Sequence, residues 1–180
     1  LLGLEAKLEV DRVALAAIRE ELGSVTPDCW LFFEALFVSS DRIGTVRALS
    51  TRMGVLPSTL MSRFFRAHLP SPKRYLASAR LLRAARLFSD PGHSIADVAN
   101  ALEYSSPQSF GRHVQTVLGM TAGEFRRRFN AEQMLERTLS DLVRPHREAL
   151  RALSPLAVRP GMKPPPTTQV RRPAHHARRA

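Results

Sequence analysis

Residues 94–129 read SIADVANALEYSSPQSFGRHVQTVLGMTAGEFRRRF, and this stretch decides the fold. Ser94 suits a helix N-cap, because its hydroxyl can accept a hydrogen bond from a backbone N–H of the first turn. The apolar residues that follow recur at i, i+3, i+4 and i+7, a spacing that predicts one buried stripe on a helix. They are Ile95, Val98, Ala99 and Leu102.

A second helix is predicted after the break at Tyr104 to Ser106, because Pro107 suits the first turn of a helix, where its missing N–H costs nothing. Its apolar residues fall on one side: Phe110, Val114, Val117 and Leu118. An amide, hydroxyls and an arginine fall on the exposed side or at the helix start, which suits contact with base edges in a major groove. We take five residues as candidates for DNA contact: Ser106, Gln108, Ser109, Arg112 and Thr116. The pattern predicts a DNA-binding helix-turn-helix over residues 94–119.

Part of this pattern occurs once more upstream, at an offset of forty-nine residues. Thr45 pairs with Ser94, and continuing the register pairs Met61 with Phe110 and Arg63 with Arg112. After a slip of one residue, Ser71, Pro72 and Tyr75 pair with Thr121, Ala122 and Phe125. The repeat predicts a second helix-turn-helix unit over residues 45–69.

The second helix of this upstream unit also divides into two arcs at about 100° per residue. We expect the apolar arc to be buried: Leu60, Met61, Phe64, Phe65 and His68. We take the polar arc as the second set of candidates for DNA contact: Ser58, Thr59, Ser62, Arg63 and Arg66.

A continuous helix over residues 72–89 is predicted to join the two units. Eighteen residues make a rod of about 27 Å, which is close to one turn of B-DNA at roughly 34 Å, so two recognition helices could enter successive grooves. Candidates for phosphate contact are Thr45, Lys73, Arg74 and Ser94, together with three further arginines of the joining helix, Arg80, Arg83 and Arg86.

The stretch from Thr45 to Phe129 resembles the DNA-binding domain of AraC-type transcription regulators. Three segments carry the resemblance: RMGVLPSTLMSRFFRAHLPSPKRYL, RLLRAARLFSDPGHSIADVANAL and YSSPQSFGRHVQTVLGMTAGEFRRRF. The resemblance implies a bacterial or archaeal regulator in the cytoplasm, associated with the nucleoid when bound. Its partners would be double-stranded DNA, RNA polymerase and a sensor or dimerisation domain upstream. Glu103 and Leu69-Pro70 depart from the family pattern, which has glycine at both places.

Charge is distributed unevenly along this chain of net charge +11. Residues 45–129 carry thirteen Lys and Arg against four Asp and Glu, and residues 156–180 carry six against none. Residues 1–44 are acidic, with four against eight. A basic excess confined to the repeat and the C-terminal end favours a polyanionic partner such as nucleic acid.

Several other classes of protein lack support in the sequence. Cys29 is the one cysteine and lies among apolar residues, which indicates a core thiol. The six histidines form no metal-binding pattern, and no catalytic motif or cofactor fingerprint occurs. No run approaches the roughly 18 apolar residues of a membrane span. We therefore expect no enzymatic activity, no metal, no cofactor and no membrane partner.

The fold class predicted is all-α, with helices flanking the two units. Residues 1–25 are predicted to form an N-terminal helix that either connects to a sensor or packs on its own domain, and residues 26–130 the DNA-binding domain. A helical segment over 131–153 contains Pro145, which should kink or split it, and the Pro- and Arg-rich residues 154–180 are predicted to be disordered. We expect residues 45–129 to suffice for DNA binding, provided that the helix with Trp30, Phe33 and Phe37 is retained to close the core of the first unit, so that residues 26–130 fold and bind DNA.

Two alternatives to a sequence-specific regulator stay open at this point. A non-specific architectural protein would use the same basic surface without reading bases, and a protein-interaction module would carry degenerate helix-turn-helix units. The polar residues on both predicted recognition faces favour base readout over either alternative.

Overall fold

The computed structural model describes residues 2–37 and 44–153 of the chain. All regular structure in these ranges is helical, which confirms the predicted all-α fold class. The elements are α1 (Leu2–Leu22), α2 (Pro27–Phe37), α3 (Val46–Arg52), α4 (Pro57–Arg66), α5 (Pro72–Leu87), α6 (Ile95–Ala101), α7 (Pro107–Leu118), α8 (Ala122–Arg128), α9 (Ala131–Thr138), the π-helix η1 (Leu139–Val143), the 3-10 helix η2 (Arg144–His146) and α10 (Arg147–Arg151). The predicted disordered tail, residues 154–180, lies outside the described residues.

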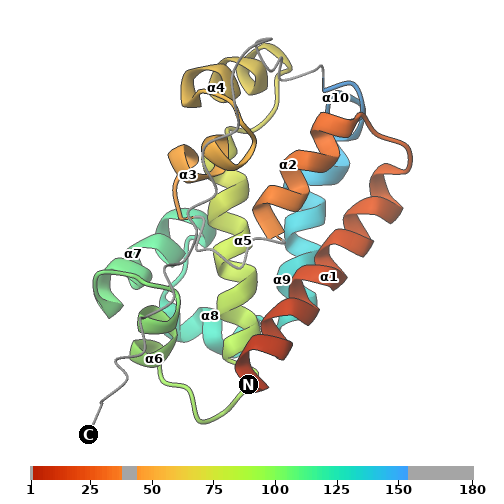
Figure 1. Ribbon diagram of the computed structural model, residues 1–180. Coiled ribbons are helices and arrows are strands. Elements are labelled where there is room, and N and C mark those ends of the chain that lie inside the picture. The colour runs from red at the N-terminus through yellow and green to blue at the C-terminus, as the bar shows by residue number, and fades with distance from the viewer. Residues whose placement is uncertain (1, 38–43, 154–180) are drawn as a thin grey trace, which may run out of the picture.

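Helix α5 lies at the centre of the molecule, with the two helix-turn-helix units on one side and α1, α2 and α9 on the other (Figure 1). It begins with Ser71 as N-cap and Pro72 in the first turn, as such a helix start favours. Nine of its sixteen residues are buried, because helices cover it on several sides. The helix ends at Leu87, two residues earlier than predicted, and is about 24 Å long at 1.5 Å per residue.

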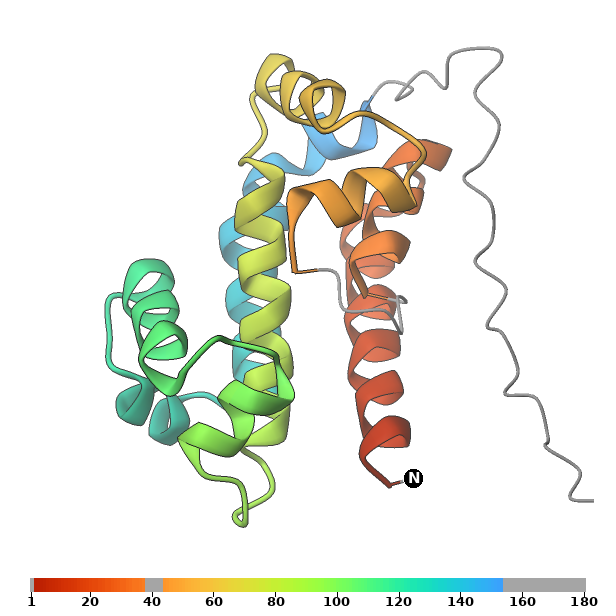
Figure 2. The same cartoon turned by 60° about the vertical axis from the view of Figure 1, so that its left-hand side comes forward.

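The helices that flank the repeat share one hydrophobic core with it. Ile18 and Leu22 of α1, Met134 of α9 and Val143 of η1 are all buried in the cluster that contains the apolar side of α5. Helix α9 lies alongside α5, and α1 packs on α2, α5 and η1 (Figure 2). The sequence left two interpretations for residues 1–25, a connector to a sensor or a helix that packs on its own domain. The structure shows this helix packed on its own domain. The expectation that residues 45–129 suffice for DNA binding stays a prediction, and this shared core bears on it because α5 would lose part of its cover in a shorter chain.

An aromatic cluster joins α2, α4 and α5. The ring centroids of Phe32 and Phe64 are 4.8 Å apart, and those of Phe32 and Tyr75 are 5.4 Å apart in an edge-to-face arrangement. The Tyr75 hydroxyl donates a hydrogen bond to the Leu142 carbonyl at 3.0 Å, and burial raises the pKa of this hydroxyl. Cys29 is buried in the same region, and burial raises its pKa to about 12, so the core thiol predicted from the sequence is confirmed.

A buried ion pair ties α5 to the N-terminal helices. The Arg83 Nε lies 3.2 Å from the Asp11 Oδ1, and both side chains are almost fully covered, at 12% and 7% exposure. Arg83 also donates from Nη2 to the Leu36 carbonyl at 3.0 Å. Arg83 is therefore committed to the core, and the prediction that it approaches phosphates is wrong. Its side chain lies on the side of α5 that α1 and α2 cover.

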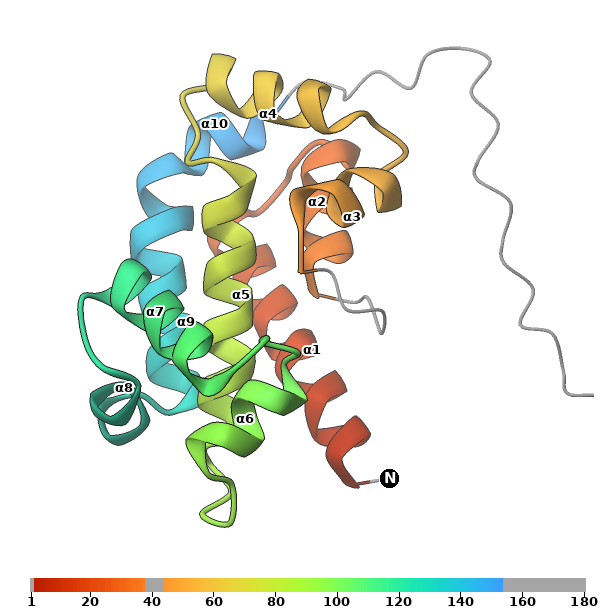
Figure 3. The same cartoon turned by 90° about the vertical axis from the view of Figure 1, so that its left-hand side faces the viewer.

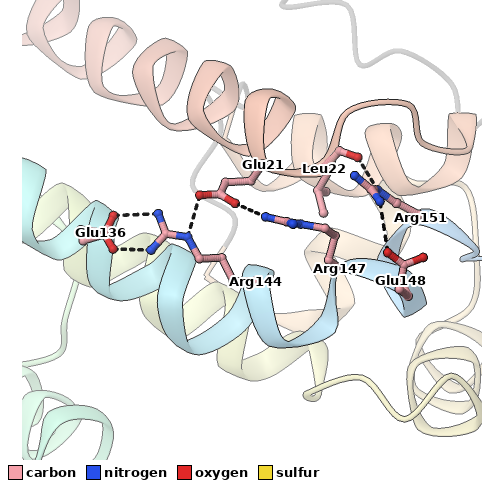
Figure 4. Close-up of polar contacts among 7 residues, drawn as sticks. All are labelled: Glu21, Leu22, Glu136, Arg144, Arg147, Glu148 and Arg151. Atoms are coloured by element: carbon pink, nitrogen blue, oxygen red, sulfur yellow. Dashed lines mark hydrogen bonds and ion pairs between the residues drawn. The ribbon is translucent and has the colours of Figure 1, made fainter.

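Residues 131–153 form a C-terminal strut, a name we use for α9, η1, η2 and α10 together. The strut changes from π-helix to 3-10 helix around Pro145, which confirms the predicted break. Arg144 pairs with both Glu136 and Glu21, and Arg147 pairs with Glu21 at 2.6 Å (Figure 4). Hydrogen bonds from these arginines hold the pKa of the Glu21 carboxyl below its usual value.

The end of the strut is fixed to the loop between α1 and α2. Arg151 donates from Nε to the Leu22 carbonyl at 2.5 Å, and the Thr26 hydroxyl donates to the Leu153 carbonyl at 2.8 Å. The strut thus starts directly after α8 and ends beside α2 (Figure 1) and close to α4 of the first unit (Figure 3). It runs beside α5 and links the same two ends of the molecule.

Candidate nucleic-acid interface

Helices α4 and α7, the second helices of the two units, both run across α5 on one side of the molecule (Figure 3). Each begins with proline in its first turn, at Pro57 and Pro107. Each also buries two apolar side chains one turn apart, and these four residues are fully covered: Leu60, Phe64, Phe110 and Val114. Both helices therefore turn their opposite sides to solvent.

The exposed side of α7 is polar. Gln108, Arg112 and Thr116 are exposed, as predicted, and the Thr116 hydroxyl donates to the Arg112 carbonyl at 2.8 Å. Gln115 is exposed on the same arc and was missing from the predicted set. Its position, three residues after Arg112 and seven after Gln108, carries the helical spacing that could have revealed it.

Ser106 and Ser109 make the start of α7. The Ser106 hydroxyl accepts from the Ser109 backbone N–H at 3.1 Å, and the Ser109 hydroxyl in turn accepts from the Ser106 backbone N–H at 3.3 Å. This reciprocal capping box leaves both side chains half-buried. Both side chains therefore cap the N-terminus of α7, and their contact with DNA stays a prediction.

The exposed side of α4 differs from the prediction. Ser58 and Arg66 are exposed, while Thr59, Ser62 and Arg63 are half-buried. Arg66 lies along the helix and donates from Nη2 to the Ser62 hydroxyl at 2.8 Å.

Three residues placed on the buried arc of the upstream unit are exposed. Met61 is 41% and Phe65 is 82% exposed, so the prediction that they belong to the core is wrong. His68, which follows the helix, is exposed as well. Since Leu60 and Phe64 fill the core, Met61 and Phe65 are turned about 100° away from it.

Burial also corrects the register of the repeat. The N-caps Thr45 and Ser94 are forty-nine residues apart, but Leu60 and Phe110, which fill the same position of the two cores, are fifty apart. The slip of one residue lies in the turn within the second unit, where Ser105 adds one residue, and not after the recognition helix. Arg112 therefore corresponds to Ser62, and the predicted equivalence of Arg112 with Arg63 is wrong.

The turns of the two units keep a left-handed backbone even where glycine is absent. Gly54 has φ +68°, and Glu103, its counterpart forty-nine residues on, has φ +58°. His68, just before Leu69-Pro70, has φ +53°. Left-handed conformations cost non-glycine residues about 1–2 kcal/mol, so both departures from the family pattern carry backbone strain.

An arginine clamp holds the second unit on α5. The Arg80 guanidinium lies 3.9 Å from the ring centroid of Tyr104 and donates from Nη2 to the Leu102 carbonyl at 2.9 Å. The Tyr104 hydroxyl is hydrogen-bonded to Nδ1 of His113 on α7. Burial, with help from the positive charges of Arg80 and Lys73, lowers the pKa of His113 to about 4, so this ring is neutral at pH 7. Arg80 thus positions α7. The prediction that it approaches phosphates is wrong.

The predicted phosphate contacts lie at helix starts. Thr45 and Ser94 are exposed N-caps whose hydroxyls accept from the backbone N–H groups of Ala48 and Asp97. Lys73 and Arg74 are exposed in the first turn of α5, and Arg86, half-buried, lies in its last turn. Contact of these residues with DNA stays a prediction.

Sequence reasoning overlooked a further cationic group on α8. Arg126, Arg127 and Arg128 are consecutive and exposed in the last turn of this helix. Arg126 donates to the Pro91 carbonyl at 3.3 Å and lies over the Phe88 ring. The run of three consecutive arginines in the sequence could have revealed this group. On a helix, however, three consecutive side chains point in different directions.

Paired helix-turn-helix units with both second helices exposed on one side define a DNA-binding protein of the double helix-turn-helix class. Residues 49–128 match the family model described as helix-turn-helix domain. This match supports an AraC-type helix-turn-helix DNA-binding domain over these residues, as the resemblance implied, and the family that the model describes is a DNA-binding regulatory one. No curated protein and no solved structure matches the chain. None of the helices in residues 2–37 and 44–153 is long and apolar enough to cross a membrane.

Proposed function

We propose that the chain is a sequence-specific transcription regulator that places α4 and α7 in two successive major grooves on one face of a duplex. The observation that carries the proposal is the exposure of both helices across the same side of α5 (Figure 3). With a length of about 24 Å, α5 can separate two units by a distance comparable to one helical turn of about 34 Å when the width of the units is added.

The second unit offers the stronger case for base readout. Arg112 can donate two hydrogen bonds to a guanine edge, and Gln108 and Gln115 can pair with adenine. All three side chains are exposed and lie on one arc of α7. An architectural protein would need only cations and apolar wedges, so these amides support the reading of bases over non-specific binding.

The basic residues around the helices supply affinity that is independent of sequence. Lys73 and Arg74 are exposed in the first turn of α5, and the three arginines are exposed in the last turn of α8; we expect them to contact phosphates. A location in the cytoplasm with the chromosome is part of this proposal. RNA polymerase and a sensor or dimerisation domain stay predictions from the family resemblance.

Selection of sites from random duplexes, followed by footprinting of the full chain, tests the proposal. We expect protection of two segments one helical turn apart. Arg112→Ala should relax preference at particular base pairs by about 1–3 kcal/mol. The control is Arg12→Ala, which removes an equal charge from an exposed site on α1, away from α7. Affinity for random DNA equal to that for the selected site at physiological salt would support the architectural alternative instead.

A further inference from the structure

The two recognition helices present different chemistry at equivalent positions. With the register fixed at fifty residues, Phe65 of α4 corresponds to Gln115 of α7, and Ser62 corresponds to Arg112. Met61 corresponds to Gly111 in the same way. The exposed face of α7 is thus built from hydrogen-bonding groups, whereas the exposed face of α4 carries the apolar side chains of Met61 and Phe65 beside Ser58 and Arg66.

The apolar face of α4 is not needed for the fold. Leu60 and Phe64 complete the core of the first unit with no exposed area, whereas Phe65 leaves 82% and Met61 leaves 41% of its surface in water. Leu56, at the N-cap position before α4, is 58% exposed and forms no side-chain cap. Apolar side chains grouped on a surface mark a binding site more often than chance exposure does.

Charges around this face point to the kind of partner. Arg66 lies on the same arc of α4, and Lys73 and Arg74 follow at the start of α5, all three exposed. Acidic residues are missing from the whole of residues 44–76. A partner must therefore combine negative charge with a small apolar contact. The major groove of DNA does so, because phosphates line it and each thymine presents a C5-methyl group there.

We propose that Met61 and Phe65 make the first unit select thymine through its methyl group, while α7 selects bases through hydrogen bonds. This inference rests on the proposed function and adds the base that the first unit reads. The bound site would consequently be asymmetric, with thymines at defined positions in the half that α4 contacts. The half that α7 contacts would favour guanine or adenine at positions facing Arg112 and the glutamines.

Replacing single thymines by deoxyuridine in the selected site is the direct test, since deoxyuridine pairs identically and lacks only the methyl group. Arg112→Ala first shows which half-site belongs to α7, because it relaxes base preference there. In the other half, we expect each contacted thymine to lose about fourfold in affinity when its methyl is removed. In the α7 half, the same replacement should change affinity by less than about twofold.

The variants Phe65→Ala and Met61→Ala should abolish this sensitivity, so that each binds the thymine and deoxyuridine duplexes with similar affinity. Both side chains are exposed, so folding, checked by circular dichroism, should persist. Arg112→Ala is the matched control and should keep the full sensitivity in the α4 half. Phe65→Val, which retains a smaller apolar group, should keep part of it.

Three results would overturn the inference. The ratio of affinities for thymine and deoxyuridine duplexes could stay unchanged in both Phe65→Ala and Met61→Ala. Methyl removal could matter only in the half that Arg112 reads. Phe65→Ala could leave DNA binding intact but remove self-association in sedimentation, which would assign the face to a protein partner. A selection that returns no preferred sequence is a different failure, because it removes the proposed function itself.

Discussion

The backbone strain at Glu103 leads to the prediction that glycine stabilises the chain more than alanine does at two equivalent turns. Glu103 and Gly54 both have positive φ, at +58° and +68°. The change at each site is between alanine and glycine: Gly54→Ala in the first unit, and Glu103→Ala against Glu103→Gly in the second. Both Glu103 variants lack the carboxylate and its contacts, so their difference reports the backbone alone.

The magnitude follows from two opposing terms. A side chain in the left-handed region costs about 1–2 kcal/mol. Alanine recovers about 0.4–1 kcal/mol of this, because it restricts the unfolded chain more than glycine does. A Cβ added at Gly54 would meet no heavy atom within 4 Å, so no steric cost is added. We expect glycine to be more stable than alanine by about 0.5–1 kcal/mol at both positions, which corresponds to roughly 1–4 °C in Tm for a chain of this size.

Urea unfolding followed by circular dichroism measures these differences, with thermal unfolding as a second method. Ala96→Gly on the exposed side of α6 is the control, because there φ is helical and glycine should be the less stable residue by about 1 kcal/mol. Equal stability of the alanine and glycine variants at position 103 would refute the argument, since it would show that the turn relaxes out of the left-handed region at no cost.

Three further predictions concern the core and the interface. The pKa of His113 is lowered to about 4 from 6.5, so the unfolded chain binds more protons between these values. The free energy of unfolding should therefore fall by about 1–2 kcal/mol as pH drops through this window, a value that allows for the partial solvent exposure of His113. Urea unfolding at several pH values should show a smaller fall for His113→Gln. Arg83→Met should lower the free energy of unfolding by about 1.5–3 kcal/mol, because it removes the charged hydrogen bonds to the Asp11 carboxylate and the Leu36 carbonyl; thermal unfolding measures the loss. Ending the chain at Asn130 should abolish cooperative unfolding by circular dichroism, because it uncovers the Tyr75 side of α5.

Local signals in the sequence predicted most helix starts correctly. Ser94 and Ser106 are N-caps in capping boxes, and prolines occupy the first turns of α4, α5 and α7. These features depend on the few residues around each helix end, and so they can be read from the chain alone. Pro145 likewise breaks the C-terminal strut, because its missing N–H acts locally.

The face of α4 was not predictable in the same way. Leu60 and Met61, and again Phe64 and Phe65, are adjacent apolar pairs, and either member of each pair fits a helical stripe. The repeat then favoured the wrong members, because the inserted residue in the turn of the second unit shifts the register before the recognition helix. Only the observed burial of Leu60 and Phe64 decides between the two registers.

Arginines of α5 show the limit of sequence reasoning most clearly. Arg80 and Arg83 lie on the same predicted helix as Arg74, and the sequence around them does not set them apart. In the structure Arg80 contacts the Tyr104 ring, whereas Arg83 pairs with Asp11, seventy-two residues earlier in the chain. A buried partner at such a separation leaves no local trace. The excess of basic residues over 45–129 therefore overstates the charge available to DNA, since at least these two cations are committed to the fold.

Those committed arginines explain why the flanking helices matter to a DNA-reading domain. Arg83 holds α1 and α2 against α5, and Arg80, about one turn earlier on the same helix, holds the second unit. The C-terminal strut runs beside α5 and links the same two ends of the molecule, fixed by the pairing of Arg144 with Glu21 and Glu136 (Figure 4). Two parallel connections resist bending far better than a single helix. If the proposed two-groove binding holds, we expect these connections to set the separation and relative angle of α4 and α7, so that a duplex with a different spacing between its half-sites would have to deform to engage both helices.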